Sequence, residues 1–237
     1  MVKVKQNLVL LPGLLCDATL RHHQHKYLGE LAEITIADFT DDDSMAGMAE
    51  ASLAKAPERF ALAGLSMGGY VALEIMRRAP ERVTKLALLD TSDRGEVEEQ
   101  TKRRRELIQM STEGKFREVT QQILPFLIHP DRQGDKGLTD AIIKMADHVG
   151  PDAFLRQEKA IMGRSDSRDD LGRIKCPTLI LCGRQDALTP VDAHEEMATG
   201  ISKARFVIIE DCGHMTTMER PQAVTALLRD WLLYSRS

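Results

Sequence analysis

The segment Gly64-Leu65-Ser66-Met67-Gly68 places a serine between two glycines, directly after the apolar run Phe60–Gly64 and before a helical pattern. A sharp turn from a strand into a helix needs neighbours without bulky side chains, and such a turn presents its central serine as a nucleophile. The pattern also fits a loose glycine-rich turn in which Ser66 only caps the following helix. Residues elsewhere in the chain distinguish these two interpretations.

A serine nucleophile needs a histidine as general base and a carboxylate that orients the histidine. His214 lies in a loop after the apolar run Ala204–Glu210, and Asp186 lies in a loop after the run Thr178–Cys182. Because functional loops of an open parallel sheet gather at the carboxyl ends of its strands, we expect both side chains to reach Ser66. The chain order serine, aspartate, histidine is also the order expected after a nucleophile elbow.

Asp90 is a competing carboxylate, because it ends the apolar run Val83–Leu89 and could face the same crevice. We favour a strand-terminating cap before Thr91 for it, since aspartate is common at such ends. The remaining histidines are expected on helix surfaces or in turns: His22, His23, His25, His129, His148 and His194. No carboxylate or cysteine completes a metal site around His22 and His25, so no metal is expected.

An oxyanion hole needs two backbone N–H groups that converge on the developing negative charge. Met67, the residue after the candidate nucleophile, should supply one of them. The second should come from the loop after the first apolar run, where Pro12 and Gly13 turn the chain. Leu14 is our choice for that donor, with Leu15 as the alternative.

Six apolar runs predict strands, and helical patterns separate most of them. Continuous apolarity is typical of strands covered on both faces, and the alternation predicts an α/β fold with a mostly parallel sheet between helices. The predicted strands are 7–11, 33–37, 60–64, 83–89, 178–182 and 204–210, and the predicted helices are 18–31, 44–56, 67–79, 191–201 and 221–234.

The alternation stops once, after the fourth predicted strand. We therefore predict a core formed by residues 1–93 and 174–237, and a helical lid, or cap, formed by residues 94–173. A lid that leaves from the carboxyl edge of the sheet would roof the crevice, so its removal should change substrate preference more than the core fold. The candidate substrate contacts are Leu15, Phe126, Leu127, Phe154 and Met162.

The basic run Lys102-Arg103-Arg104-Arg105 could guide an anionic substrate such as an acyl-CoA. A solvated helix face is the interpretation that we favour for this run.

Composition agrees with an ordinary globular protein of 237 residues, with 43% hydrophobic and 29% charged residues. A net charge of −4 is mild and favours neither a nucleic-acid partner nor a membrane surface. Four cysteines without CxxC spacing are typical of a reduced cytoplasmic protein. The apolar run near the N-terminus is shorter than that of a signal peptide, and no run approaches the length of a membrane span.

Together these motifs resemble the α/β-hydrolase superfamily, and in particular its lidded, serine esterase-like branch. The resemblance is carried by Leu11–Leu14, Gly64–Gly69, Gly183–Asp186 and Gly213-His214. It implies an α/β-hydrolase fold with Ser66 as nucleophile, His214 as base, Asp186 as its partner, and Leu14 and Met67 as oxyanion donors.

Two positions depart from the family pattern. Pro12 stands where the family usually has a histidine, and Arg21 or His22 stands where it often has a tryptophan, which predicts a more polar entrance.

The expected activity is hydrolysis of a small carboxylic ester, thioester or lactone through an acyl-enzyme, without a cofactor. C–C bond hydrolysis or elimination on the same residues is one alternative. A ligand-sensing, hydrolase-like receptor is another.

Overall fold

A sheet of six parallel strands forms the centre of the computed structural model, which describes residues 5–234. The strands are β1 (Gln6–Leu11), β2 (Ala32–Ile36), β3 (Phe60–Leu65), β4 (Val83–Leu89), β5 (Thr178–Gly183) and β6 (Ala204–Ile209). They lie in the order β2-β1-β3-β4-β5-β6, and every neighbouring pair is parallel. All six predicted strands are therefore confirmed.

The strand order reverses beside β1, because the chain first adds β2 on one side of it and then β3 on the other. Ligands of open parallel sheets bind outside the carboxyl ends of the strands at such a switch point. The loops that follow β1 and β3 meet there, and they carry the first-loop residues 12–16 and Ser66.

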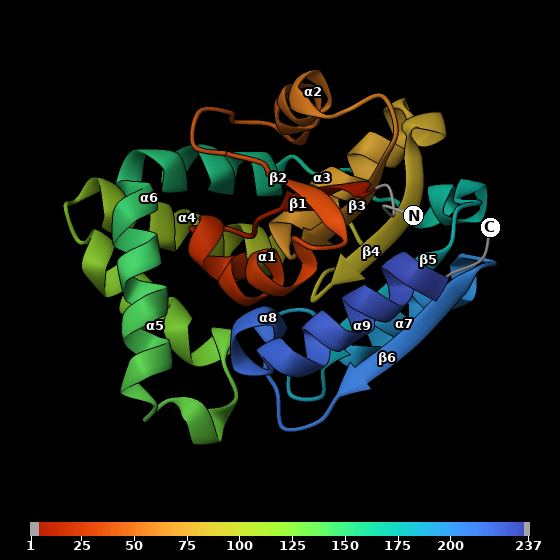
Figure 1. The fold of residues 1–237 in the computed structure, drawn as a ribbon. Coiled ribbons are helices and arrows are strands. Elements are labelled where there is room, and N and C mark those ends of the chain that lie inside the picture. Colours follow the sequence, from red (N-terminus) through yellow and green to blue (C-terminus); the bar gives the residue numbers. More distant parts are fainter. Residues whose placement is uncertain (1–4, 235–237) are drawn as a thin grey trace.

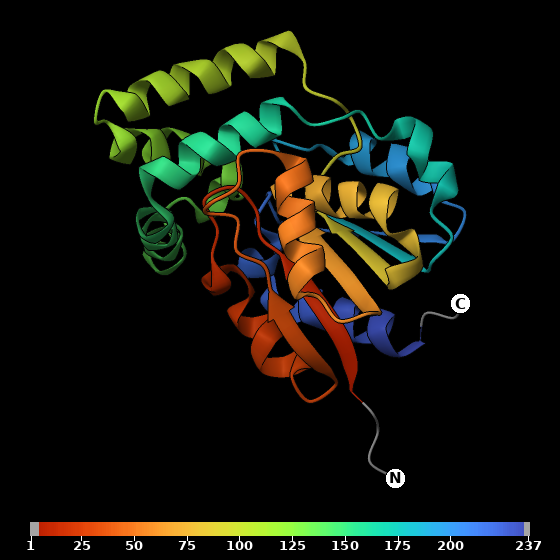
Figure 2. The ribbon, with the colours of Figure 1, turned by 90° about the horizontal axis from the view of Figure 1, so that it is seen from above.

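Helices cover both faces of the sheet. They are α1 (His22–Leu28), α2 (Met45–Lys55), α3 (Met67–Arg78), α7 (Val191–Gly200), α8 (Thr216–Glu219) and α9 (Pro221–Tyr234), with short 3-10 turns at Ala18–Arg21 and Pro80–Arg82. One apolar cluster packs α1 and α9 against the sheet, and a second packs α2, α3 and α7 against its other face. Figures 1 and 2 show these two layers from perpendicular directions.

Between β4 and β5 the chain forms only helices: α4 (Glu98–Thr112), α5 (Phe116–Leu127) and α6 (Lys136–Met162), with 3-10 turns at Pro130–Arg132 and Arg168–Arg173. In Figure 1 these three helices, in green, stand together at one end of the sheet. Gly150, at φ 82°, interrupts α6 directly before Pro151. A small apolar cluster, which includes Val119 and Phe154, packs the inserted helices against one another and against Leu15 of the first loop.

Candidate active site

Ser66 lies in a strained turn between β3 and α3, with φ 53° and ψ −118°. The glycines around it are required by close backbone approach. A Cβ on Gly64 would lie 2.2 Å from the carbonyl oxygen of Gly68, and a Cβ on Gly68 would lie 2.3 Å from that of Leu11. The turn therefore has the geometry of a nucleophile elbow, and strain of this kind is concentrated at functional sites.

The structure brings Ser66, His214 and Asp186 into one hydrogen-bonded chain. His214 Nε2 lies 2.8 Å from Ser66 Oγ, and His214 Nδ1 lies 2.9 and 2.8 Å from the two carboxylate oxygens of Asp186. Asp186 also accepts hydrogen bonds from the backbone N–H groups of Leu188 and Thr189 and from the Thr189 hydroxyl. These hydrogen bonds hold the Asp186 carboxylate in place beside the imidazole of His214.

Burial and charge act in opposite directions on this pair. Burial would lower the pKa of His214, but Asp186, with smaller contributions from Asp90 and Glu219, raises it above its ordinary value. Burial would raise the pKa of Asp186, but His214 and the donors from Thr189 hold it below its ordinary value. An ionised Asp186 beside a basic imidazole is the arrangement in which His214 can take a proton from Ser66.

Asp90 forms no hydrogen bond with His214, and its predicted role as a cap is wrong. Its side chain bonds to neither of the residues that follow it. Instead, the fully buried carboxylate accepts hydrogen bonds from Gly183 N–H at 3.2 Å and from the N–H and hydroxyl of Thr216 at 3.3 and 2.5 Å. Both partners belong to other loops, so a sequence motif around Asp90 could not reveal them.

Two further sequence predictions are wrong because the side chains concerned are buried. His194 is 0% exposed, accepts a hydrogen bond from Thr91 N–H, and has a pKa lowered to about 4 by burial. Arg21 is also 0% exposed and does not line the cavity beside Ser66, so it cannot make the entrance more polar. Its guanidinium donates to the carbonyl of Leu11 beneath the first loop.

The two candidate oxyanion donors carry N–H groups without a hydrogen-bond partner among residues 5–234. These are the backbone N–H groups of Leu14 and Met67. Leu15, the alternative donor, already gives its N–H to Gln157 Oε1 at 2.9 Å. This contact favours Leu14 over Leu15 as the second donor.

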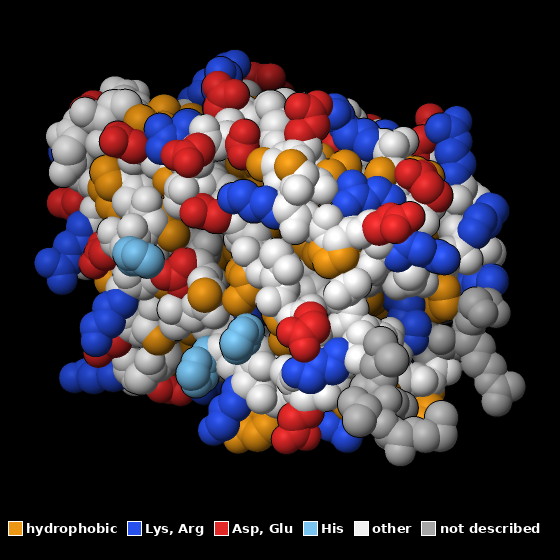
Figure 3. All heavy atoms as spheres, turned by 45° about the horizontal axis from the view of Figure 1, so that its top comes forward, with side chains coloured by type: hydrophobic (Ala, Val, Ile, Leu, Met, Phe, Trp, Pro, Cys, Tyr) orange, Lys and Arg blue, Asp and Glu red, His pale blue; other side chains and the backbone are white. Residues whose placement is uncertain are grey.

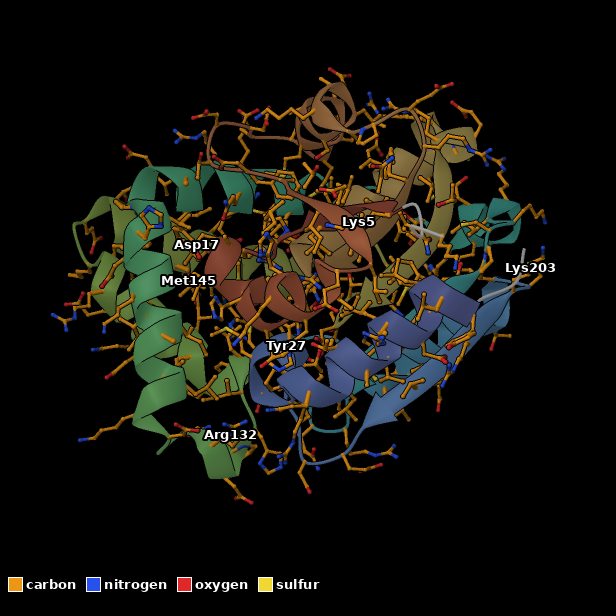
Figure 4. The ribbon with its side chains drawn as sticks, in the orientation of Figure 1. Lys5, Asp17, Tyr27, Arg132, Met145 and Lys203 are labelled. Carbon is orange, nitrogen blue, oxygen red and sulfur yellow. The ribbon has the colours of Figure 1, made fainter. Side chains whose placement is uncertain are left out.

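A cavity of about 410 Å³ opens beside Ser66 and His214. Its walls come from the loops at the carboxyl ends of the strands and from α4, α5 and α6. Apolar side chains on these inserted helices form much of one wall: Leu107, Ile123, Leu127, Ile142, Met145 and Ala146. Figure 4 labels Met145 on α6. Residues 98–162 therefore contribute part of the cavity wall, and their role as a lid stays a prediction.

Of the candidate substrate contacts, Leu15 and Leu127 line this cavity, and the other three do not. Phe126 is 40% exposed and packs under Arg103, because it lies on the outer face of α5. Phe154 is fully buried in the apolar cluster of the inserted helices. Met162 ends α6 and is half-buried outside the cavity.

The four residues of the basic run on α4 do not share one role. Neither a guide for an anionic substrate nor a solvated helix face describes all of them. Arg104 forms ion pairs with Glu96 at 3.0 Å and Glu158 at 2.7 Å, so its charge is compensated inside the insertion. Arg103 lies 4.1 Å above the ring of Phe126 and lines the cavity. Lys102 and Arg105 lie outside the cavity lining, on the solvated side of the helix.

The loop that carries His214 is held by the inserted helices as well as by the sheet. Met215 N–H donates to the carbonyl of Leu127 at 2.9 Å. Glu219, 3% exposed, accepts from Gly213 N–H and from His129 N–H, each at 2.8 Å. The Arg132 guanidinium, labelled in Figure 4, donates to the backbone carbonyl of Glu219. Sequence motifs gave no sign of these supports.

Other kinds of site are not indicated in the described part of the chain. Within residues 5–234, no group of three or more histidine, cysteine, aspartate or glutamate side chains could hold a metal ion. The same residues include no helix that is both long and apolar enough to cross a bilayer. Acidic and basic side chains are interspersed over the face shown in Figure 3.

Known hydrolases are similar to this chain in sequence. The chain is 28% identical over 192 residues to a pimeloyl-[acyl-carrier protein] methyl ester esterase of Nitrosomonas europaea, which covers 76% of this chain and 74% of that protein. It is 28% identical over 181 residues to a 2-hydroxy-6-oxo-6-phenylhexa-2,4-dienoate hydrolase of Comamonas testosteroni, which covers 74% of this chain and 63% of that protein.

A solved structure, a thermophilic esterase from Thermogutta terrifontis, superimposes with a TM-score of 0.89 at 27% identity, over 100% of this chain and 92% of that one. The family model described as "Alpha/beta hydrolase family" matches residues 12–227. The chain therefore belongs to the alpha/beta hydrolase family.

Proposed function

We propose that this protein is a serine hydrolase that cleaves a small carboxylic ester, thioester or lactone through an acyl-enzyme on Ser66. The observation that carries the proposal is the hydrogen-bonded chain from Ser66 Oγ through His214 to Asp186 at the edge of a 410 Å³ cavity. That volume is within the range of pockets that enclose small ligands.

The chemistry follows from the proton positions that this chain permits. His214 Nε2 removes the Ser66 proton while Ser66 Oγ attacks the substrate carbonyl. The N–H groups of Leu14 and Met67 then stabilise the negative charge on the carbonyl oxygen. His214 returns its proton to the leaving group and afterwards activates the water that releases the acyl group.

The lining of the cavity favours an acyl or alkyl group with an aliphatic part. The aliphatic side chains of Leu15, Ile123, Leu127 and Ile142 all line it. Cys16 also lines the cavity, but burial raises the pKa of its thiol to about 12, so it stays protonated and is a poor rival nucleophile.

C–C bond hydrolysis is the second candidate. The Comamonas testosteroni relative supports it, because that protein is a 2-hydroxy-6-oxo-6-phenylhexa-2,4-dienoate hydrolase. The same serine, histidine and aspartate could serve either reaction, since one fold supports many chemistries.

A panel of esters, thioesters, lactones and C–C substrates, assayed with Ser66→Ala, tests the proposal. We expect ester turnover that falls by about 10⁶ in kcat in the variant, as in the best-studied triad. A fluorophosphonate probe should label the wild type once, at Ser66, and should label Cys16→Ser equally well. Turnover by Ser66→Ala would contradict the serine-hydrolase assignment.

Multiple-turnover kinetics separate an enzyme from a ligand-sensing receptor. A receptor would release at most one product per chain or bind ligand without turnover. Turnover of the C–C substrates together with inert esters would instead favour the second candidate.

A further inference from the structure

We propose that Asp90 is a positioning residue, which fixes the loop of Asp186 and the loop of His214 relative to one another. The inference rests on the proposed function, because positioning matters only if these residues act together. Asp90 does not line the cavity and forms no hydrogen bond with the imidazole ring, so its direct bonds are to other groups.

Asp90 forms its first set of hydrogen bonds with β5, which leads into the loop of Asp186. The backbone N–H of Asp90 donates to the carbonyl of Leu181, which extends the pairing between β4 and β5. The chain then turns sharply, with φ 45° at Asp90, and the next N–H of β5 that faces β4 bonds to a side chain. Asp90 Oδ1 accepts that N–H, from Gly183, three residues before Asp186.

Asp90 forms its second set of hydrogen bonds with the segment that follows His214. Asp90 Oδ2 accepts both the N–H and the hydroxyl of Thr216, which is 0% exposed and lies two residues after His214. One carboxylate thus links the two segments, in addition to the bonds between Gln185 and Cys212 and between Asp186 and His214. A Cβ on Gly183 would lie 2.1 Å from the carbonyl oxygen of Gly213.

Ionisation of a carboxyl group is unfavourable at this buried position, and a neutral side chain would avoid that cost. Burial, and then the charge of Asp186, raise the pKa of Asp90 well above its ordinary value. A residue without acceptor oxygens would avoid that cost, but it would leave the buried donors of the two loops without partners. Three donors that converge from the two loops give a reason for the acid, because a carboxylate oxygen can accept more than one hydrogen bond.

Misplacement of a reacting group by about 1 Å can reduce the rate by about 10²-fold. We therefore expect Asp90→Ala to lower kcat by about 10²-fold with little change in KM. Asp90→Asn keeps one acceptor oxygen and should recover part of that loss. Thr216→Val keeps the N–H bond and loses only the hydroxyl, so its kcat should fall less than that of Asp90→Ala.

The control is Ser52→Ala, which removes a buried hydroxyl bonded to Met48 on α2, far from the site. It should match the wild type in kcat. The rate of fluorophosphonate labelling should fall in the Asp90 variants in step with kcat, which a general loss of stability would not produce in folded protein.

Wild-type kcat in folded Asp90→Ala would overturn the inference. If that variant does not fold, wild-type kcat in both Asp90→Asn and Thr216→Val would overturn it. A change in KM alone, with wild-type kcat, would also overturn it. The proposed function fails separately, since turnover by Ser66→Ala would refute it whatever the Asp90 variants do.

Discussion

The change Glu219→Gln tests whether the inserted helices support the general base. Glu219 uses one carboxylate oxygen for Gly213 N–H, next to His214, and the other for His129 N–H in the insertion. Glutamine has one acceptor oxygen, and its amide nitrogen can only donate. One of the two buried N–H groups must therefore lose its partner, while the volume of the side chain stays nearly the same.

The expected size of the effect follows from that lost bond. A buried donor without a partner costs about 1–3 kcal/mol of stability. About 2 kcal/mol corresponds to a fall of roughly 4–8 °C in melting temperature for a chain of this length. If the orphaned donor is Gly213 N–H, the His214 loop loosens and kcat should fall by roughly 10- to 100-fold.

Thermal unfolding and steady-state hydrolysis of one ester measure the two effects. Glu118→Gln is the matched control, because it makes the same chemical change at an exposed position of α5 and should alter neither quantity. Wild-type melting temperature together with wild-type kcat in Glu219→Gln would refute the reasoning. A lowered melting temperature with unchanged kcat would show that Glu219 stabilises the fold but does not support catalysis.

Three further predictions concern the site itself. Asp186→Asn should lower kcat by about 10⁴ in a steady-state assay, because it favours the wrong imidazole tautomer; wild-type turnover would remove Asp186 from the mechanism. His214 must be neutral to act as a base, and its pKa lies above its ordinary value of 6.5, so kcat/KM should fall with decreasing pH through a midpoint above 6.5. A pH–rate profile with its acid limb below that value would contradict the assignment. Gly68→Ala should abolish fluorophosphonate labelling and lower the melting temperature, because its Cβ would meet the Leu11 backbone, whereas Gly134→Ala meets no atom within 4 Å and is the control.

The fold could be predicted because the strands are continuous apolar runs and the elements alternate. Ser66, Asp186 and His214 could be predicted to meet because each follows a strand of one parallel sheet, and such strand ends share an edge. That argument needs only the order of the elements. It gives no information about which way a helix is rotated over the crevice.

The substrate contacts show this limit. Side chains of α5 that line the cavity are Thr120, Ile123 and Leu127, which share one helix face at spacings of three and four. Phe126 lies to one side of that face and does not line the cavity, although its aromatic side chain made it a candidate. The helical spacing of residues within 116–127 could have indicated which side chains line the cavity. The aromatic type of a residue did not indicate this.

The buried polar supports could not be predicted, because their partners lie far apart in the sequence. Asp90 and Thr216 are separated by 126 positions, and His129 and Glu219 by 90. A polar residue has the same local pattern whether it ends a strand in solvent or meets donors from a distant loop. Only the packed structure separates those cases.

The inserted helices therefore serve the site in two distinct ways, which point variants can separate. Ile123 lies in the cavity wall, so Ile123→Ala should favour bulkier acyl groups without lowering kcat for the best small ester. His129 contributes its N–H to Glu219, and proline removes that N–H.

His129→Pro is compatible with the backbone, because His129 has φ −55° and the preceding Ile128 has extended angles of φ −130° and ψ 159°. It should lower kcat for all substrates by a similar factor, since the effect acts on His214 and not on the cavity wall. Rates across the ester panel decide between the two roles. If His129→Pro changed only the order of preferred substrates, the insertion would be a lid and nothing more, and the support of His214 would come from the sheet alone.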